Sequence, residues 1–260
     1  MAELMIRREG AVGWIVFSNP ARHNALTYDM WRALPQALAG FSADPQVRVV
    51  VLAGDGDKAF VSGADISQFE AARGTDEAEH EYNRAVEEAF VAPIHCAKPV
   101  IAKIRGICMG GGLGLAAGCD IRMAADDAIF RMPAARLGVG YRFSGMQRFV
   151  QLLGPLSTSD LFFSARKFDA HEALRMGFVS RVVRAADLDR EVGAYCASVA
   201  ENAPLTLVAA KAAIREALRE PEARDLQALE NLVGACWSSE DYREGRDAFI
   251  QKRRPDFKGR

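Results

Sequence analysis

Apolar residues recur along this chain in two ways, as short β-branched runs and at helical spacing. Val47–Ala53 (VRVVVLA) has the composition and length of a buried strand. After Thr27, which can cap a helix, Met30, Leu34 and Leu38 recur at the spacing of a helix that covers a sheet face. The same reasoning predicts two strands within 5–18, strands at the start of 98–120 and at 121–125, 128–132 and 177–183, and a charged helix at 66–90.

Beyond Asp187 every predicted element is a helix, with apolar stripes within 188–199, 205–218, 228–237 and 241–253. Strands and helices alternate in the first 187 residues. This order of predicted strands and helices indicates an α/β fold followed by a helical C-terminal region.

Composition and charge narrow the class of protein. The 260 residues are 50% hydrophobic, enough for a sizeable core. A net charge of -1 gives no overall attraction to nucleic acid or to an anionic membrane surface. No run approaches the roughly 18 apolar residues of a membrane span. Five cysteines without CxxC spacing are typical of reduced core residues, and four scattered histidines show no ligand spacing. We therefore expect a soluble, cytoplasmic protein without a metal site.

The stretch 98–120 (KPVIAKIRGICMGGGLGLAAGCD) carries the most chemical information. An apolar run breaks at Gly110, Gly111 and Gly112 and continues as small residues, which predicts a strand, a tight turn and a helix N-terminus. The first N–H groups of a helix lack partners and lie at the positive end of its dipole. Such a turn favours an anion or a carbonyl that becomes one, although a packing turn has the same sequence.

Six motifs in order give the chain a resemblance to a known family. They are GDGDKAFVSGADI, KPVIAKIRGICMGGGLGLAAGCDI, PAARLG, ALRMGFVSRVV, APLTLVAAK and SSEDYREGRDAFIQKRRPDF. In order and spacing they resemble the crotonase (enoyl-CoA hydratase/isomerase) superfamily, from about residue 5 to the C-terminus. The resemblance implies a ββα spiral core with an acyl-CoA site over 1–200, and a C-terminal helical trimerisation and lid region over 201–260. It also implies acyl-CoA thioester substrates, no cofactor besides that coenzyme A, and homotrimers or dimers of trimers.

The resemblance also implies site residues. The family's two N–H donors to the thioester oxygen fall on Ala64 and Gly111, and Asp65, Ile66 and Gly110 adjoin them as substrate-binding positions. For Asp65 a helix-capping role is an alternative. Basic residues are expected to line the entry of coenzyme A, and the matching positions are Arg22 with Ala25, and Lys252 or Lys258 from a neighbouring subunit.

Two positions depart from the family pattern. The glutamates that hydratases use to activate water fall on Gly114 and Ala134, and neither side chain can move a proton. Tyr141 instead follows an LGV turn, as in the family's methylmalonyl-CoA decarboxylases, and Arg142 beside it could pair with a substrate carboxylate. Loss of CO₂ generates an enolate without a base, so an oxyanion hole and an orienting hydroxyl suffice.

These residues and the resemblance leave three possible functions. The favoured one is a lyase that decarboxylates a malonyl- or methylmalonyl-type CoA ester. The first alternative is an enoyl-CoA hydratase or isomerase of fatty acid metabolism with relocated acid–base groups, for which Glu87 or Glu88 is a candidate. The second alternative is a non-catalytic acyl-CoA binder.

Overall fold

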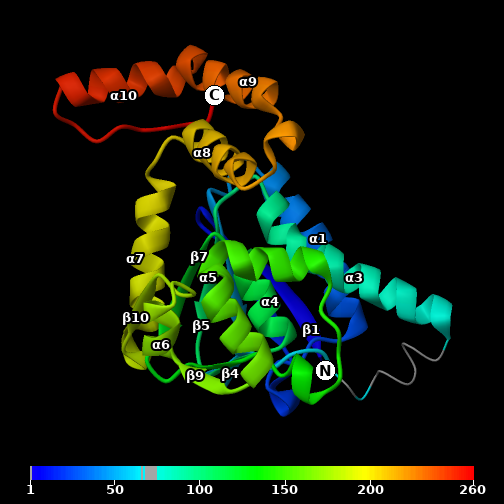
Figure 1. The fold of residues 1–260 in the computed structure, drawn as a ribbon. Coiled ribbons are helices and arrows are strands. Elements are labelled where there is room, and N and C mark those ends of the chain that lie inside the picture. Colours follow the sequence, from blue (N-terminus) through cyan, green and yellow to red (C-terminus); the bar gives the residue numbers. More distant parts are fainter. Residues whose placement is uncertain (1, 66, 68–74) are drawn as a thin grey trace.

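Two mixed sheets form the frame of the molecule. The computed structural model describes residues 2–65, 67 and 75–260. Within that part of the chain, one sheet has the strand order β1-β2-β3-β5-β7-β10 and the other β4-β6-β8-β9. Helices pack on and around the sheets, as the sequence predicts for an α/β fold (Figure 1). The strands are β1 (Glu3–Glu9), β2 (Val12–Ser18), β3 (Val49–Gly54), β4 (Ala59–Val61), β5 (Val100–Ile104), β6 (Ile107–Met109), β7 (Ile121–Ala125), β8 (Ile129–Arg131), β9 (Lys167–Asp169) and β10 (Arg181–Val183).

A ββα unit is repeated three times and builds the core as a spiral. In each turn the first strand joins the larger sheet, the second joins the smaller sheet, and a helix follows. The turns are β3-β4-α3 (Asp76–His95), β5-β6-α4 (Gly111–Gly118) and β7-β8-α5 (Phe143–Ser164). Equivalent strands of successive turns pair in parallel. The predicted ββα spiral is therefore confirmed.

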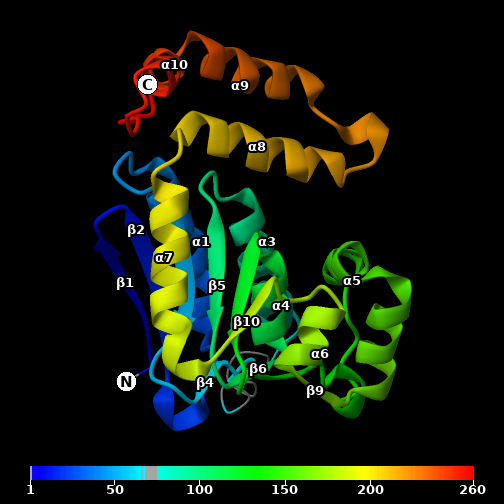
Figure 2. The ribbon, with the colours of Figure 1, turned by 90° about the vertical axis from the view of Figure 1, so that its left-hand side faces the viewer.

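Alternation along the strands gives the larger sheet two buried faces. Val49 and Val51 pack on one side with Leu188 and Val192 of α7 (Leu188–Ala200). Their neighbours on the strand point to the other side, because successive side chains of a strand face opposite ways. Figure 2 shows α7 running along the sheet and α4 on its other side. A strand buried on both faces reads as a continuous β-branched run, which is the pattern in VRVVVLA.

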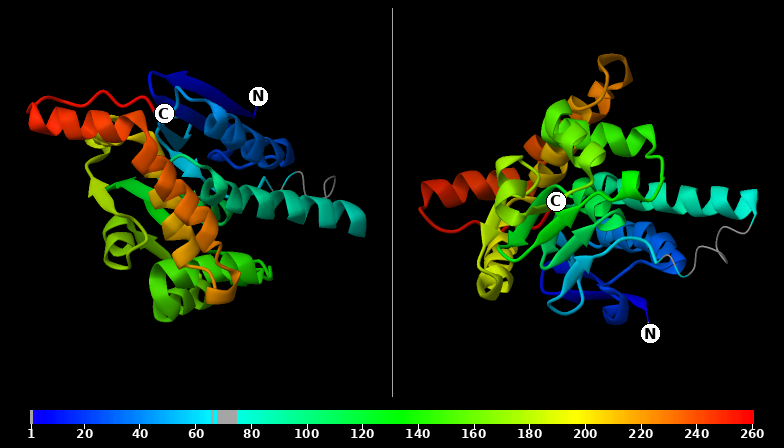
Figure 3. Two further views of the ribbon diagram at one scale, coloured as in Figure 1. Left: turned by 90° about the horizontal axis from the view of Figure 1, so that it is seen from above. Right: turned by 60° about the horizontal axis from the view of Figure 1, so that its bottom comes forward.

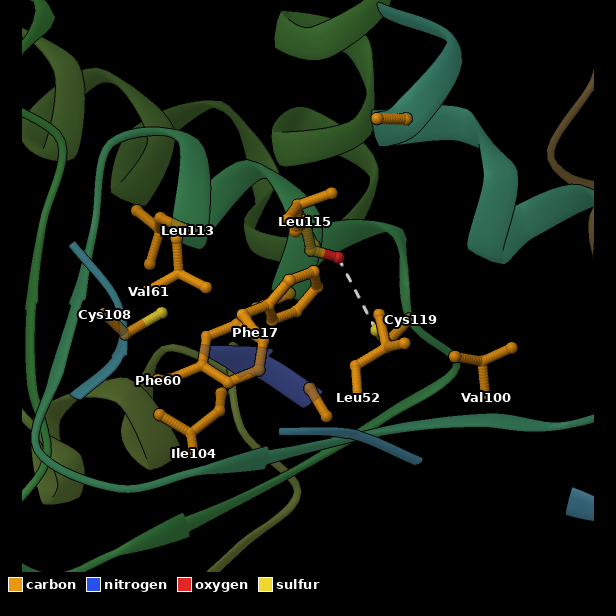
Figure 4. Packing of buried hydrophobic residues seen from close by; sticks show 14 of the residues in the cluster. Phe17, Leu52, Phe60, Val61, Val100, Ile104, Cys108, Leu113, Leu115 and Cys119 are labelled. Carbon is orange, nitrogen blue, oxygen red and sulfur yellow. Dashed lines mark hydrogen bonds between the residues drawn. The ribbon is translucent and has the colours of Figure 1, made fainter. Parts of the chain in front are cut away.

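The main core lies between the sheets and α4. Phe17, Phe60 and Leu113 are fully buried there, and Figure 4 shows them packed around Val61 and Cys108. The cysteines Cys96, Cys108, Cys119 and Cys196 are buried thiols, and Cys236 is half-buried; none is in a disulfide within the described part of the chain. Burial raises the pKa of Cys119 to about 12, so this thiol is a packing residue.

One predicted helix begins at the expected cap. Helix α1 (Tyr28–Ala43) is capped by Thr27, whose Oγ1 accepts from the N–H of Met30 at 3.3 Å, and Pro35 is accommodated inside it. For the helix predicted at 66–90, residues 66 and 68–74 lie outside the described residues, and α3 runs from Asp76 to His95. The remaining helices are α6 (Ala170–Arg175), α8 (Pro204–Ala217), α9 (Leu226–Ser238) and α10 (Glu240–Ile250), with short 3-10 turns at Pro20–Arg22, Ala134–Arg136, Ala185–Asp187 and Pro221–Ala223.

One strand prediction is too long. The run GFVSRVV was expected to form a strand over 177–183, but β10 covers only Arg181–Val183. Gly177 has a φ of +80° and its N–H donates to Leu174, so it ends the preceding helix instead. Phe178 is apolar because it is buried in the core, which a strand pattern does not distinguish.

The C-terminal helices lie outside the spiral, and α8 contacts it through Lys211. Figures 2 and 3 show α8, α9 and α10 as a layer across one end of the core. Helix α9 has no buried residue, and its Leu226, Val233 and Trp237 are exposed. The predicted trimerisation and lid roles of 201–260 stay predictions. No helix in the described ranges is long and apolar enough to cross a membrane.

Candidate active site

The glycine turn forms between β6 and α4. Gly110 has φ +52° and ψ -115°, a conformation that an L side chain rarely adopts, and its N–H donates to the carbonyl of Arg131 at 3.0 Å. The chain reverses there, and Gly111 becomes the first residue of α4. Its N–H therefore belongs to the helical turn that has no intrahelical acceptor.

A second N–H is presented by the loop after β4. Ala64 forms an isolated parallel bridge with Leu26, in which Leu26 N–H donates to Gly63 O at 2.9 Å and Asp65 N–H donates to Leu26 O at 2.8 Å. This pairing uses the groups on either side of the Ala64 N–H and leaves that N–H unused.

The two N–H groups lie close together. A Cβ placed on Gly111 would be 3.7 Å from the Ala64 nitrogen, and one placed on Gly63 would be 3.8 Å from the Gly111 nitrogen. Neither N–H has an acceptor among the described residues. Both residues are only half-buried, so the pair is accessible. Two adjacent, unpaired donors are the arrangement of an oxyanion hole.

Trp31 explains why position 111 is glycine. A Cβ there would lie 2.9 Å from Cη2 of Trp31, which is closer than side chains pack. Trp31 is 1% exposed and its indole meets Phe90 edge to face at 5.6 Å. The Trp31 indole therefore packs against the first residue of α4, Gly111. Sequence reasoning assigned the α1 stripe to the core and missed this contact, since only the three-dimensional arrangement brings the two positions together.

One turn further along α4, Tyr141 occupies the space beside Gly114. A Cβ on Gly114 would lie 2.8 Å from the Phe90 ring and 3.0 Å from the Tyr141 hydroxyl. These residues line a small cavity of about 40 Å³ together with Glu87 and Ser144. Ala134, the other position without the family's glutamate, is 8% exposed and starts the turn after Pro133. No carboxyl group stands at either position.

The Tyr141 hydroxyl is buried and has no hydrogen-bond partner within the described part of the chain. The ring is fixed by edge-to-face contacts with Phe162 at 5.0 Å and Phe149 at 6.2 Å. Burial raises the pKa of Tyr141, so the hydroxyl stays protonated and is available as a donor.

Glu87 of α3 is the carboxylate that lines this cavity. It accepts from Nη1 of Arg142 at 3.1 Å and from the hydroxyl of Ser144 at 3.3 Å. In this structure Arg142 pairs with Glu87, and the expectation that it pairs with a substrate carboxylate stays a prediction. The ion pair is partly exposed, with 55% and 34% of the two side chains accessible, and it links α3 to the start of α5.

Arg22 and Asp65 pair with each other beside the two N–H groups. Arg22 Nη1 lies 3.0 Å from Asp65 Oδ1, which also accepts from the N–H of Ser67 at 3.1 Å and its hydroxyl at 2.7 Å. Asp65 is 7% exposed and thus orders the loop that carries Ala64. Ala25 is buried next to Leu26, at the bridge to Ala64. Ile66 lies outside the described residues.

Lys252 and Lys258 lie at the other end of the molecule. Their tail follows α10, and Phe257 O accepts from Arg48 at the start of β3, whereas Ala64 and Gly111 follow β4 and β6 (Figure 2). Within one chain these lysines are not part of the site. Nor does any group of three His, Cys, Asp or Glu side chains in residues 2–65, 67 and 75–260 have the arrangement of a metal site.

Comparison with known proteins places this fold and glycine turn in one family. A family model described as enoyl-CoA hydratase/isomerase matches residues 7–260. A crotonyl-CoA hydratase of Syntrophomonas wolfei is 31% identical, covering 98% of this chain and 97% of the relative. A peroxisomal Delta(3,5)-Delta(2,4)-dienoyl-CoA isomerase of Arabidopsis thaliana is 30% identical, covering 96% of this chain and 93% of the relative.

A solved structure agrees with this result. The crystal structure of an enoyl-CoA hydratase/carnithine racemase from Magnetospirillum magneticum has a TM-score of 0.94 at 35% identity, covering 100% of this chain and 97% of that one. This chain belongs to the enoyl-CoA hydratase/isomerase family.

Proposed function

We propose that this chain acts on an enoyl-CoA thioester through an enolate, as a hydratase or isomerase. The observation that supports it is the pair of adjacent N–H groups of Ala64 and Gly111, which have no acceptor among the described residues. Donors fixed in advance at a developing oxyanion need no rearrangement during the reaction. Each is worth about 10²–10³ in rate.

Glu87 is the acid–base group in this proposal. It lines the cavity that begins beside Gly114, one helical turn from Gly111, and neither Gly114 nor Ala134 offers a carboxyl. The relatives of this chain, a crotonyl-CoA hydratase and a dienoyl-CoA isomerase, support hydratase and isomerase chemistry over decarboxylation. In this proposal the acid–base group lies on α3, at Glu87, and not on α4 at the position of Gly114.

A single carboxylate favours double-bond migration over hydration. In migration, one base removes a proton from Cα of a 3-enoyl thioester, the electrons pass into a dienolate, and the same acid returns the proton to Cγ. Hydration needs one group to deprotonate water and another to protonate carbon. The Tyr141 hydroxyl, which is protonated and has no partner among the described residues, is the group that would protonate carbon in hydration.

Decarboxylation is the second candidate. Tyr141 and the missing carboxyls at Gly114 and Ala134 favour it, because an unpaired carboxylate there would repel a malonyl-type substrate. Against it, Arg142 is already paired with Glu87. A non-catalytic acyl-CoA binder would keep the oxyanion hole and show no turnover.

The remaining expectations are part of the same proposal. Arg22, and Lys252 or Lys258 from a neighbouring subunit, would meet the phosphates of coenzyme A. Residues 201–260 would form the trimer contacts, and the enzyme would work in the cytoplasm without a further cofactor.

Parallel assays test the proposal. The purified protein is given 2-hexenoyl-CoA, 3-hexenoyl-CoA and methylmalonyl-CoA, with hydration, conjugation of the double bond and CO₂ release as the three readouts. We expect conjugation of 3-hexenoyl-CoA at the highest kcat/KM. CO₂ release alone would replace the proposal with decarboxylation, and tight binding without any turnover would replace it with the binder.

A further inference from the structure

A second, larger cavity lies beyond the first, at the C-terminal end of α4. It has a volume of about 340 Å³, is partly open to solvent, and is lined by the ends of α3 and α4, the first half of α5, and α8 with the turn after it. Ile94 and Arg148 line both this cavity and the smaller one beside Gly114. The two cavities therefore adjoin at these side chains.

Arg148 lies at this junction, and one of its terminal nitrogens is left without a protein acceptor among the described residues. Its Nε donates to Ala117 O at 2.7 Å and its Nη2 to Cys119 O at 3.5 Å, and Nη1 has no acceptor in the described ranges. It is half-buried, and the Asp120 carboxylate attracts its charge without a direct ion pair among the described residues. Burial lowers its pKa, the sign of a cation held away from water. Capping of α4 uses two of the five guanidinium N–H groups, and Arg148 lines both cavities.

The other cations of the larger cavity each have a carboxylate partner. Lys211 contacts Asp120 at 2.7 Å and donates to two backbone carbonyls, of Pro93 and Lys98. Arg215 and Arg219 both contact Glu216, which is 3% exposed. Arg148 is thus the cation of this lining with donors to spare for a ligand.

The two cavities extend along α4 away from the oxyanion hole. Gly111, Gly114 and Ala117 succeed one another at intervals of one helical turn, and the first cavity touches Gly114 and Ala117. Six positions of helix separate Gly111 from Ala117, the acceptor of Arg148, which is about 9 Å. That separation suits a short acyl chain whose thioester oxygen lies at Gly111 and whose far end lies at Arg148.

We propose that Arg148 binds a terminal carboxylate on the acyl group, so that the substrates of this chain are CoA thioesters of short dicarboxylic acids. The inference rests on the proposed acyl-CoA function and names its substrate class. A guanidinium and a carboxylate form two parallel charge-assisted hydrogen bonds, which a methyl terminus cannot replace. A methyl-terminated chain would instead cover the Arg148 guanidinium without giving its remaining N–H groups an acceptor.

Binding of two saturated thioesters of equal length tests the proposal without relying on turnover. Calorimetry measures the affinities of adipyl-CoA and hexanoyl-CoA for the full chain. We expect adipyl-CoA to bind about tenfold to a hundredfold more tightly, the range of a hydrogen bond to a charged group. Arg148→Met should bring the two affinities together without weakening hexanoyl-CoA, whereas Arg215→Gln, which changes a paired arginine of the same cavity, should keep the preference.

Two further measurements guard against a misfolded variant. Arg148→Lys keeps the positive charge but loses the two parallel N–H donors of the guanidinium. This variant should therefore keep only part of the preference for adipyl-CoA. In the unmodified protein the preference should shrink as salt is raised. Equal affinities in the unmodified protein, or an unchanged preference in Arg148→Met, would overturn this inference and leave the proposed function standing. Failure to bind either thioester would overturn both.

Discussion

The hydroxyl of Tyr141 lies 3.0 Å from the point where a side chain at Gly114 would begin. Glycine at 114 and tyrosine at 141 therefore depend on each other: a larger residue at 114 would collide with the hydroxyl and with the Phe90 ring at 2.8 Å. The site is therefore packed differently from one that carries the family's glutamate at position 114. The Tyr141 hydroxyl lies next to the place that the carboxyl would occupy.

Removal of the Tyr141 hydroxyl should raise the stability of the protein and lower its activity. In Tyr141→Phe a buried, unpaired polar group is lost and the ring contacts remain, so the free energy of unfolding should rise by about 1 kcal/mol. Because the hydroxyl is proposed to donate to the substrate, kcat/KM should fall about tenfold. Urea denaturation and steady-state kinetics measure the two effects. A less stable variant with unchanged kinetics would show that the hydroxyl serves packing alone.

A methyl group at position 111 should disable the oxyanion hole. The added Cβ of Gly111→Ala would lie 2.9 Å from Trp31, and it would displace the N–H by moving the first turn of α4. We expect kcat/KM to drop by about 10²–10³. Gly193→Ala is the matched control, since its Cβ meets nothing within 4 Å. Comparable losses of activity in both variants would argue against a special role for Gly111.

Glu87→Gln tests the relocated acid–base group. Its amide keeps the shape of the side chain but cannot take up a proton, so kcat should fall by about 10²–10⁴ with little change in KM. Glu88→Gln, on the exposed side of the same helix, should leave kcat unchanged. The partly exposed contact with Arg142 contributes at most about 1 kcal/mol to stability, so both variants should fold. Full activity in Glu87→Gln would require another base.

The C-terminal tail should be sensitive to acid through Glu244. Hydrogen bonds from Arg253, and then from the N–H of Asp256, lower the pKa of Glu244 to about 2. A carboxyl whose pKa is lowered by folding stabilises the folded state above its ordinary pKa of about 4.3, and the effect disappears as the pH falls toward 2. Unfolding measured from pH 7 to pH 2 should therefore show Glu244→Gln less stable at pH 7, with the difference vanishing in acid. A constant difference would contradict this.

The sequence predicts the parts of this site that depend on local backbone. Gly110 and Gly111 indicate a turn into a helix N-terminus, because glycine readily adopts the positive φ that Gly110 has. The β-branched run at Val47 likewise predicts a strand buried on both faces. The ββα order then follows from the resemblance of six motifs.

Pairings between distant segments could not be predicted from one sequence. Arg142 pairs with Glu87 across 55 positions, and Arg148 lies between two cavities that α3, α4, α5 and α8 line together. A charged side chain has the same local pattern whether it faces water, a substrate or another helix. The packing of the helices determines which of these a charged side chain contacts, and Arg142 contacts Glu87.

Exchange of α-protons tests the enolate most directly, because it does not depend on which product is formed. Butyryl-CoA is incubated in D₂O with the unmodified protein, Glu87→Gln and Gly111→Ala, and loss of the Cα proton signal is followed by NMR. We predict exchange in the unmodified protein, and a rate about a hundredfold lower in each variant. A Cα signal that persists with the unmodified protein, although the thioester is bound, would contradict the account.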